Sequence, residues 1–269
     1  MRVIPFIKMD GLGNDFVIID MRKNKYALSK KDICKISNRK TGVGFDQLIV
    51  LEKSKTCDVK MKIFNADGST AGACGNGTRC VASFIFAENK KLVLTLEAPQ
   101  NKILKAWRGK LIKVDMGLPQ KEWQKIPLAK NVDTDKVALL KDLPKAVCTS
   151  MGNPHAVFFV KDLSKIDIAK YGPLIENHKM FPERTNVEFV QVLSANKIKM
   201  RVWERGAGIT NACGSGACAV LAGAYRNNLS ANKAQIIMDG GTLIIEQNKE
   251  GHILMQGATH TAFKGTLFL

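Results

Sequence analysis

The sequence predicts an α/β (α+β) protein of two pseudo-symmetric domains, each a curved, mostly antiparallel sheet wrapped around one central helix. The first observation is a repeated motif: Cys74-Gly75-Asn76-Gly77 returns as Cys213-Gly214-Ser215-Gly216, 139 positions later (213 − 74). The second is that a nearly all-apolar segment follows each motif, as expected for a helix enclosed by a sheet. The third is length, because 269 residues fit two domains of about 130 residues each.

The same 139-residue offset relates other segments of the chain. Val59-Lys60-Met61-Lys62-Ile63-Phe64-Asn65 aligns with Ile198-Lys199-Met200-Arg201-Val202-Trp203-Glu204, and both alternate apolar residues with cations as half-buried strands do. Gly13-Asn14 aligns with Gly152-Asn153, and Asp46-Gln47 with Thr185-Asn186. An alignment without gaps over so many features indicates two homologous halves.

The elements follow from periodicity and turn residues in chain order. Strands are predicted in the first half at 16–20, 47–52, 59–64, 92–97 and 103–107. In the second half they are predicted at 156–160, 188–193, 198–203, 235–238, 243–247 and 253–256. The central helices are predicted at 75–89 and 214–228, and a minor helix at 30–37 with Ser29 as its N-cap.

The domain boundary is predicted near Met116-Gly117-Leu118-Pro119. The first domain, 1–116, carries Cys74 and is completed by a C-terminal strand at about 260–269. The second domain, 117–259, carries Cys213. The active site is expected in the cleft between the two.

Cysteine usage and hydropathy suggest a reducing compartment. The seven cysteines form an odd number without a regular framework, which argues against a disulfide-stapled secreted protein. The sequence shows no signal-peptide pattern and no apolar run near the ~18 residues that a membrane span needs. We therefore expect a cytoplasmic protein without a membrane partner.

The formal net charge of +17 raises the alternative of nucleic-acid binding. The basic residues are scattered, however, without a block of five or six and without interleaved aromatic residues. A lysine-rich solvated surface is the more common explanation of such a charge, so no nucleic-acid partner is expected. Steep salt-dependent binding would revive the alternative.

Each repeated cysteine stands at a predicted helix N-terminus, which points to a reactive thiol. The positive end of the helix macrodipole favours the thiolate, and backbone amides uncovered by glycine can hold an anion. Two such thiols suit a reaction in which one base removes a proton from one face of a carbon and an acid delivers one to the other. In a productive complex each sulfur would lie about 3–3.5 Å from that carbon, so two sulfurs on opposite faces would be roughly 7 Å apart.

A metal site is the alternative reading of the cysteines. Cys80 follows Cys74, and Cys218 follows Cys213, within the predicted helices. Zinc ligands usually have the spacing C-x₂₋₄-C, and side chains five or six positions apart on a helix diverge in direction. Cys80 and Cys218 are therefore predicted to be small core residues, and no metal is expected.

Further motifs resemble those of the diaminopimelate epimerase family, and they span the whole chain. They are Gly11-Leu12-Gly13-Asn14-Asp15-Phe16, Arg39-Lys40-Thr41-Gly42-Val43-Gly44-Phe45-Asp46-Gln47, Asn65-Ala66-Asp67-Gly68-Ser69, Gly152-Asn153-Pro154-His155, Thr185-Asn186-Val187 and Trp203-Glu204-Arg205-Gly206, together with both cysteine motifs. The resemblance implies a homodimer that needs no cofactor and interconverts LL- and meso-diaminopimelate, in lysine and peptidoglycan biosynthesis.

The resemblance also implies roles for individual residues. Cys74 and Cys213 would be the catalytic pair, with His155 and Glu204 as candidates to tune the first cysteine. The amides of Gly75, Asn76, Gly214 and Ser215 would hold the carboxylate at the reacting centre. The second amino acid centre of the substrate would be bound by Asn14, Asn65, Asn153, Asn186, Glu204 and Arg205, while Gln47 lines the site.

The sequence differs from the family pattern at two positions, and one other family of enzymes is an alternative interpretation. Ile209 stands where the family commonly has glutamate, and Thr70 where a charged residue is frequent. These departures affect local structure and not the mechanism. The rival is another two-cysteine enzyme, a proline racemase or hydroxyproline epimerase, whose substrate has no second amino acid centre to bind.

Overall fold

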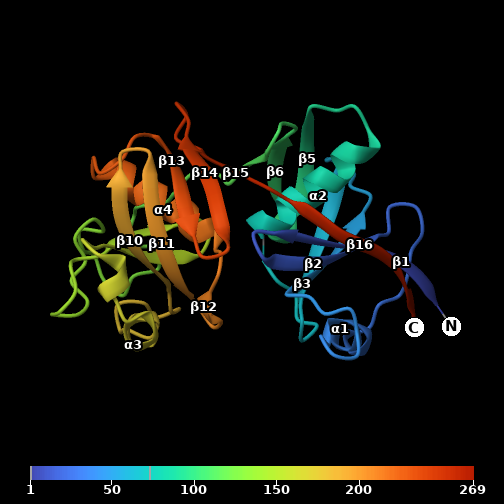
Figure 1. Cartoon of the computed structure of the whole chain (residues 1–269), viewed down its shortest axis with the longest axis horizontal. Helices are drawn as coiled ribbons and strands as arrows, with labels where there is room; N and C mark the ends of the chain where they lie inside the picture. The colour runs from blue at the N-terminus through green and yellow to red at the C-terminus, as the bar shows by residue number, and fades with distance from the viewer. Residues whose placement is uncertain (1, 73) are drawn as a thin grey trace. The chain divides into compact units, whose positions relative to one another are not determined.

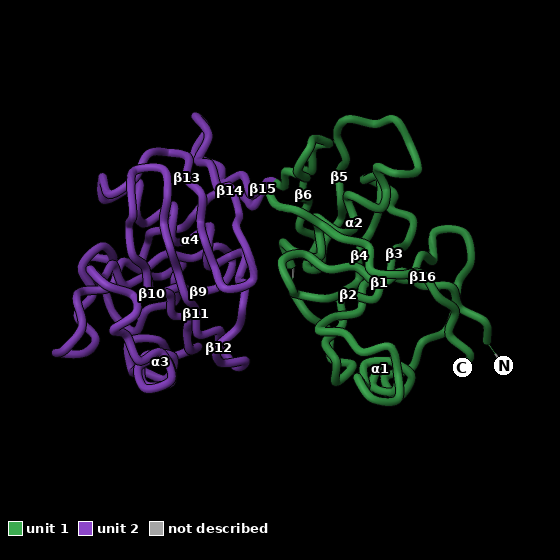
Figure 2. The backbone as a smooth tube through the Cα atoms, in the orientation of Figure 1, with its two compact units in different colours: residues 1–114, 257–269 green, residues 115–256 purple. Residues whose placement is uncertain are grey.

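The protein is described by a computed structural model, which covers residues 2–72 and 74–269. The chain divides into two compact units (Figure 2): residues 1–114 with 257–269, and residues 115–256. The first unit is therefore discontinuous in sequence, and the second is one continuous segment.

Unit 1 is a mostly antiparallel sheet around a central helix. Its elements are β1 (Val3–Gly11), β2 (Asn14–Asp20), α1 (Lys30–Ser37), β3 (Gln47–Glu52), β4 (Val59–Asn65), α2 (Gly75–Glu88), β5 (Val93–Ala98), β6 (Lys102–Trp107), β7 (Ile112–Asp115) and β16 (His260–Phe268). The strands are ordered β16-β1-β2-β3-β4-β5-β6-β7. The pairs β2–β3 and β4–β5 are parallel. The antiparallel pairs are β16–β1, β1–β2, β3–β4, β5–β6 and β6–β7.

Unit 2 repeats this plan. Its elements are β8 (Val147–Ser150), β9 (Pro154–Phe159), α3 (Ile168–Glu176), β10 (Asn186–Ser194), β11 (Lys197–Glu204), β12 (Gly208–Thr210), α4 (Gly214–Arg226), β13 (Lys233–Met238), β14 (Gly241–Gln247) and β15 (Ile253–Gly257). The strands are ordered β15-β14-β13-β11-β10-β9-β8, and β12 pairs with β11. The pairs β9–β10 and β11–β13 are parallel, at the places equivalent to the parallel pairs of unit 1.

The central helices are enclosed because they are apolar on nearly every side. In Figure 1, α2 and α4 each lie among the strands of their own unit. α4 buries ten of its thirteen residues, and its small residues, such as Ala217, Ala219 and Gly223, allow strands to approach closely. A second layer of each unit packs on the outer face of the sheet, where α1 buries Ile33 and Ile36, and α3 buries Ile168 and Ile175.

The strand registers confirm the duplication. Phe16 pairs with Gln47, and the residues 139 positions later, His155 and Asn186, pair with each other. Every element from β2 to β7 has an equivalent in unit 2 at about this offset, α1 with α3 included. The predicted α/β class, with a sheet around a central helix in each half, is confirmed.

The predicted elements agree with the structure to within a few residues, and Ser29 caps α1 through a capping box with Asp32. β1, β7, β8, β12 and α3 were not predicted. α3 carries Pro173, a residue that breaks helices, and it is held in place by packing of Gly172 against Trp203.

Candidate functional site

Cys74 is the N-cap residue of α2. Its backbone is extended (φ −120°, ψ 113°), and its sulfur accepts a hydrogen bond from the amide of Gly77 at 3.5 Å. A β-carbon at residue 77 would lie 2.7 Å from Cδ1 of Ile49, so any side chain there would have to displace that methyl group. The glycine thus lets the helix start approach the sheet, with the thiol at the positive end of the helix.

Asn14 is brought to this thiol by a tight hairpin. Leu12 and Gly13, between β1 and β2, both have positive φ (62° and 80°), which suits the two-residue turns that join antiparallel strands. Oδ1 of Asn14 lies 3.8 Å from the sulfur of Cys74 and accepts a hydrogen bond from Nδ2 of Asn76 at 3.5 Å. The other end of the Asn14 amide donates to Oδ2 of Asp46 at 2.8 Å.

A cluster of charges stands behind Asn14. Asp15 is ion-paired with the buried Lys8 at 2.6 Å and with Arg39 at 2.8 Å, and Arg39 also reaches Asp46. Burial raises the pKa of Asp15, but the hydrogen bonds from Arg39 and Lys8 outweigh this and hold it well below its usual range. Asp15 is therefore ionised at neutral pH. Asp46 also accepts hydrogen bonds from the amide of Asp15 at 3.1 Å and from Arg39 at 2.7 Å, so it acts as an acceptor toward Asn14 as well.

Gln47 and Asn65 face each other on β3 and β4, where their backbones pair. Nε2 of Gln47 lies 3.4 Å from Oδ1 of Asn65, and Nδ2 of Asn65 donates to Ser69 at 3.0 Å. Oε1 of Gln47 and Oδ1 of Asn76 are buried without a hydrogen-bond partner among the described residues. These two acceptors are available to a ligand.

Cys213 caps α4 in the same way. Its sulfur accepts from the amide of Gly216 at 3.4 Å and lies 3.6 Å from Oγ of Ser215. A β-carbon at residue 216 would lie 2.8 Å from Oε1 of Glu188. The close approach of helix and sheet is the same as at Gly77, but a carboxyl group replaces the isoleucine.

A line of hydrogen bonds leads from Ser215 into the sheet. Nδ2 of Asn153 donates to Oγ of Ser215 at 3.3 Å, and Oδ1 of Asn153 lies 3.1 Å from Nε2 of His155. Nδ1 of His155 lies 2.7 Å from Oε1 of Glu188, and both of these side chains are fully buried. The structure thus joins Cys213, Ser215, Asn153, His155 and Glu188 in one chain of contacts.

Asn186 and Arg205 form a second polar group in unit 2. Nδ2 of Asn186 donates to the carbonyl of Pro154 at 2.9 Å, and its Oδ1 accepts from the amide of Arg205 at 3.0 Å. The Arg205 guanidinium donates to the carbonyl of Glu183 at 3.0 Å and is only half-buried. Glu204 accepts a hydrogen bond from Thr210, which follows Ile209 on β12.

The protonation of Cys213 differs from the expectation that a helix N-terminus favours the thiolate. Burial raises the pKa of the Cys213 thiol well above its usual value, and the charges of Glu204 and Glu188 raise it further. The hydrogen bonds from Ser215 and Gly216 lower it, but by less. Desolvation therefore exceeds the helix effect at this cysteine.

The remaining cysteines lie outside these two groups. Cys80, Cys148 and Cys218 are buried, as predicted for core residues in the cases of Cys80 and Cys218, whereas Cys34 is exposed. Burial raises the pKa of Cys80 to about 12. Among the described residues, no group of three histidine, cysteine or acidic side chains is placed to hold a metal ion.

Sequence reasoning missed Glu188 and the orienting role of Asp46. Glu188 was read as one residue of a strand, although its equivalent in the first half is the apolar Ile49. A carboxyl group at a position that is apolar in the other half is the signal that could have identified it. Asp46 belonged to a quoted motif but was given no role.

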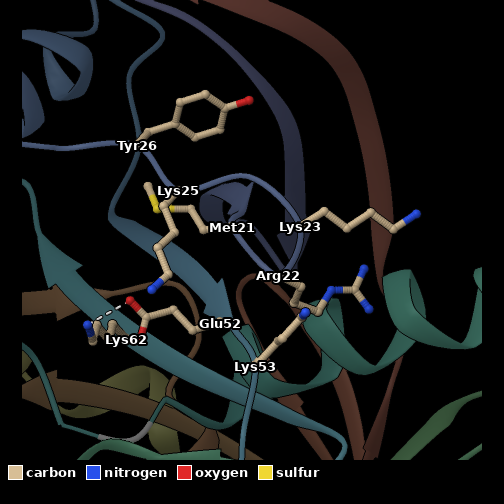
Figure 3. Close-up of a pocket in the computed structure, with 8 residues that line it drawn as sticks. All are labelled: Met21, Arg22, Lys23, Lys25, Tyr26, Glu52, Lys53 and Lys62. Carbon is tan, nitrogen blue, oxygen red and sulfur yellow. Dashed lines mark hydrogen bonds and ion pairs between the residues drawn. The ribbon is translucent and has the colours of Figure 1, made fainter.

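One pocket of the structure contains none of the predicted site residues. It lies in unit 1, has a volume of about 620 Å³, and is lined by Met21, Arg22, Lys23, Lys25, Tyr26, Glu52, Lys53 and Lys62. Figure 3 shows the ion pair between Lys62 and Glu52 at its edge. Arg22 is paired with Asp20 and Glu88, which offsets part of the positive charge.

Within the described part of the chain, none of the helices has the length and apolar character needed to cross a lipid bilayer.

The structure thus consists of two like units, each with a cysteine that caps its central helix. The family model for diaminopimelate epimerase matches residues 6–122 and 147–261. The chain belongs to this family.

Curated relatives agree over nearly the full length. A diaminopimelate epimerase of Acidiphilium cryptum is 45% identical over 98% of this chain and 96% of its own. One of Rhodospirillum centenum is 47% identical over 97% and 91%.

Solved structures share the fold at low sequence identity. A PhzF-family phenazine biosynthesis protein of Bacillus anthracis has a TM-score of 0.71 at 18% identity, with complete coverage of both chains. A hydroxyproline epimerase of Agrobacterium vitis has a TM-score of 0.72 at 11% identity, over 99% of this chain and 91% of its own.

Proposed function

We propose that the protein is a cofactor-independent epimerase that interconverts LL- and meso-diaminopimelate by inverting one α-carbon. The observation that carries the proposal is the pair of equivalent helix-capping thiols, Cys74 and Cys213, in a chain of this family. Such an activity belongs to lysine and peptidoglycan biosynthesis, in the cytoplasm.

The chemistry needs one thiolate and one thiol at opposite faces of the same carbon. One cysteine removes the α-proton, and the other delivers a proton from the opposite side, so their protonation states are exchanged at each turnover. The α-proton is weakly acidic, and the carbanion needs a field of fixed donors. The uncovered helix amides of Gly75, Asn76, Gly214 and Ser215 would supply that field at the substrate carboxylate.

The second amino acid centre of the substrate would be held by the polar groups around each thiol. Arg205 can donate two parallel hydrogen bonds to a carboxylate, and Glu204 can accept hydrogen bonds from an ammonium group. The amides of Asn14, Asn65, Asn153 and Asn186 would complete the contacts, with Gln47 beside them. A proline ring would leave these groups without partners, which favours diaminopimelate over proline as substrate.

Isotope exchange tests the assignment. Wild type, Cys74→Ser and Cys213→Ser are each given LL- and meso-diaminopimelate in deuterated water, without cofactor, and the products are separated on a chiral phase. Wild type should epimerise and incorporate deuterium at the α-carbon. Full epimerisation by both variants would exclude the two-thiol mechanism, and racemisation of proline by wild type would favour the rival substrate.

Oxidation offers a second, independent test. If both sulfurs act on one carbon, an oxidant should link Cys74 to Cys213 and inactivate the enzyme, and reductant should restore it. Absence of the linked peptide from the mass spectrum of oxidised, inactive protein would count against the proposal.

We further propose that the protein acts as a homodimer. β16 stands at the edge of the unit 1 sheet, and seven of its nine residues are exposed, including Phe263 (49%) and Phe268 (62%). An edge strand with exposed aromatic side chains is ready to pair with another chain. Light scattering should give twice the mass of one chain, and Phe268→Asp should reduce it.

A further inference from the structure

The fully buried pair of His155 and Glu188 has no counterpart in the other unit. His155 lies on β9 and Glu188 on the adjacent β10, with 2.7 Å between Nδ1 and Oε1 (strands labelled in Figure 2). At the 139-residue offset, the equivalent residues are Phe16 and Ile49, which are both buried and apolar. Buried ionisable groups cost free energy unless they are paired, so an apolar pair would suffice for packing alone.

The hydrogen bonds around His155 determine where its protons lie. Asn153 donates its amide nitrogen to Ser215, so its oxygen faces Nε2 of His155 and requires a hydrogen on that nitrogen. Nδ1 faces Glu188, whose pKa is raised by burial in spite of the opposing contact with His155. A contact of 2.7 Å between Nδ1 and Oε1 needs one hydrogen between the two atoms, supplied by either the carboxyl group or the imidazole.

In unit 1 the equivalent asparagine, Asn14, has its amide group in the opposite orientation relative to the cysteine. Asp46 accepts from Nδ2 of Asn14, which turns Oδ1 of Asn14 toward the sulfur of Cys74. In unit 2 the nitrogen of Asn153 points toward Ser215 beside Cys213. A carbonyl group is thus presented near one thiol, and an amide N–H, through the serine hydroxyl, near the other.

We propose that Glu188 is a positioning residue that, through His155, fixes the Asn153 amide so that its N–H, through the hydroxyl of Ser215, faces Cys213, whereas the carbonyl of Asn14 faces Cys74. The proposal rests on the proposed two-thiol function. Its physical basis is that a histidine tautomer is set by the partner of its other nitrogen. The two cysteines are then chemically unequal before a substrate binds, although they occupy equivalent places.

Removing the carboxyl group should release the imidazole from its fixed state. In Glu188→Leu, Nδ1 loses its partner and competes for the proton, so Nε2 no longer carries it in every molecule. In Glu188→Gln, the amide can donate to Nδ1 and keep the hydrogen on Nε2. Ile49→Leu is the matched control at the equivalent position of unit 1.

Two measurements decide the proposal. Nitrogen–proton correlation spectra of the four histidines should show a hydrogen on Nε2 of His155 throughout the wild-type and Glu188→Gln populations, and on only part of the Glu188→Leu population. The kcat of Glu188→Leu on diaminopimelate should fall about tenfold or more with little change in KM, whereas Glu188→Gln and Ile49→Leu should stay within about threefold of wild type.

These measurements distinguish failure of the proposal about Glu188 from failure of the proposed epimerase function. If wild type does not epimerise diaminopimelate, the proposed function is wrong, but the tautomer spectra still test the orienting role of Glu188. An unchanged tautomer or an unchanged kcat in Glu188→Leu would overturn the inference, as would equal damage by Glu188→Gln. Should Glu188→Leu fold poorly, the double variant His155→Phe/Glu188→Ile copies the apolar pair of unit 1. It should fold and show at least the same loss of kcat, and wild-type kcat in it would also overturn the inference.

Discussion

Replacing Gly216 by alanine tests how tightly the second thiol is held against the sheet. A β-carbon at this position would lie 2.8 Å from Oε1 of Glu188 and 3.3 Å from the sulfur of Cys213. An ordinary contact is about 3.4 Å or longer, so the carboxyl oxygen must move by about 0.6 Å (3.4 − 2.8). It is bound to Nδ1 of His155 at 2.7 Å in a fully buried place, so this movement distorts that hydrogen bond.

The magnitude follows from two opposing effects. Alanine in a helix stabilises by about 1 kcal/mol relative to glycine, whereas overpacking costs about 1–3 kcal/mol. The net loss of stability is therefore at most about 2 kcal/mol, and the variant should fold. Displacement of catalytic groups by a fraction of an ångström should lower kcat about tenfold or more.

Gly77→Ala is the matched control for Gly216→Ala. Its β-carbon would meet Cδ1 of Ile49 at 2.7 Å, but this is the free end of an apolar side chain and can rotate. Isotope exchange at the α-carbon and denaturant unfolding are measured for both variants. The reasoning is refuted if folded Gly216→Ala keeps wild-type kcat, or if Gly77→Ala is damaged more.

Three further predictions concern stability and thiol reactivity. Asp15→Asn should lower the free energy of unfolding at pH 7 by about 2 kcal/mol, as measured by denaturant unfolding. This value lies between the contributions of exposed and of buried ion pairs. Because the pKa of Asp15 is held below its unfolded value, this contribution is present above about pH 4 and declines as the pH falls further, so the difference between variants should shrink at pH 3. Gly172→Ala would place a β-carbon 2.5 Å from the rigid ring of Trp203, and should lower the free energy of unfolding by about 2 kcal/mol and shift the tryptophan emission. In peptide mass spectra, iodoacetamide should label the exposed Cys34 of native protein and leave Cys80 unlabelled.

Most of the architecture could be predicted because the chain repeats its own pattern. The offset that joins Cys74 to Cys213 also relates the strand registers of the two units, so one half corroborated the other. β1 was missed since Pro5 interrupts its apolar pattern. Pro5 is exposed and lies in the part of β1 that pairs with β16 on one side and has no partner in β2. α3 was missed because Pro173 argues against a helix that tertiary contacts nevertheless stabilise.

The polar residues were harder to predict than the strands. Asn14 and Asn153 were recognised as equivalent, but a sequence does not show which end of an amide faces a sulfur. That orientation depends on Asp46 in one unit and on His155 in the other, which are brought there by separate strands. Glu188 was missed because alternation along a strand does not distinguish a solvated carboxyl from one paired across the sheet.

The return of β16 to unit 1 has a consequence for the order of folding. Val3 pairs with Phe268 across almost the whole chain, and residues 257–269 leave the ribosome after all of unit 2. Unit 2 is continuous and can form during synthesis, whereas the sheet of unit 1 waits for its last strand. Closing so long a loop is slow. The nascent protein therefore passes through a state in which β1 has an open edge, and this is the stage at which it is most exposed to aggregation and to chaperone binding.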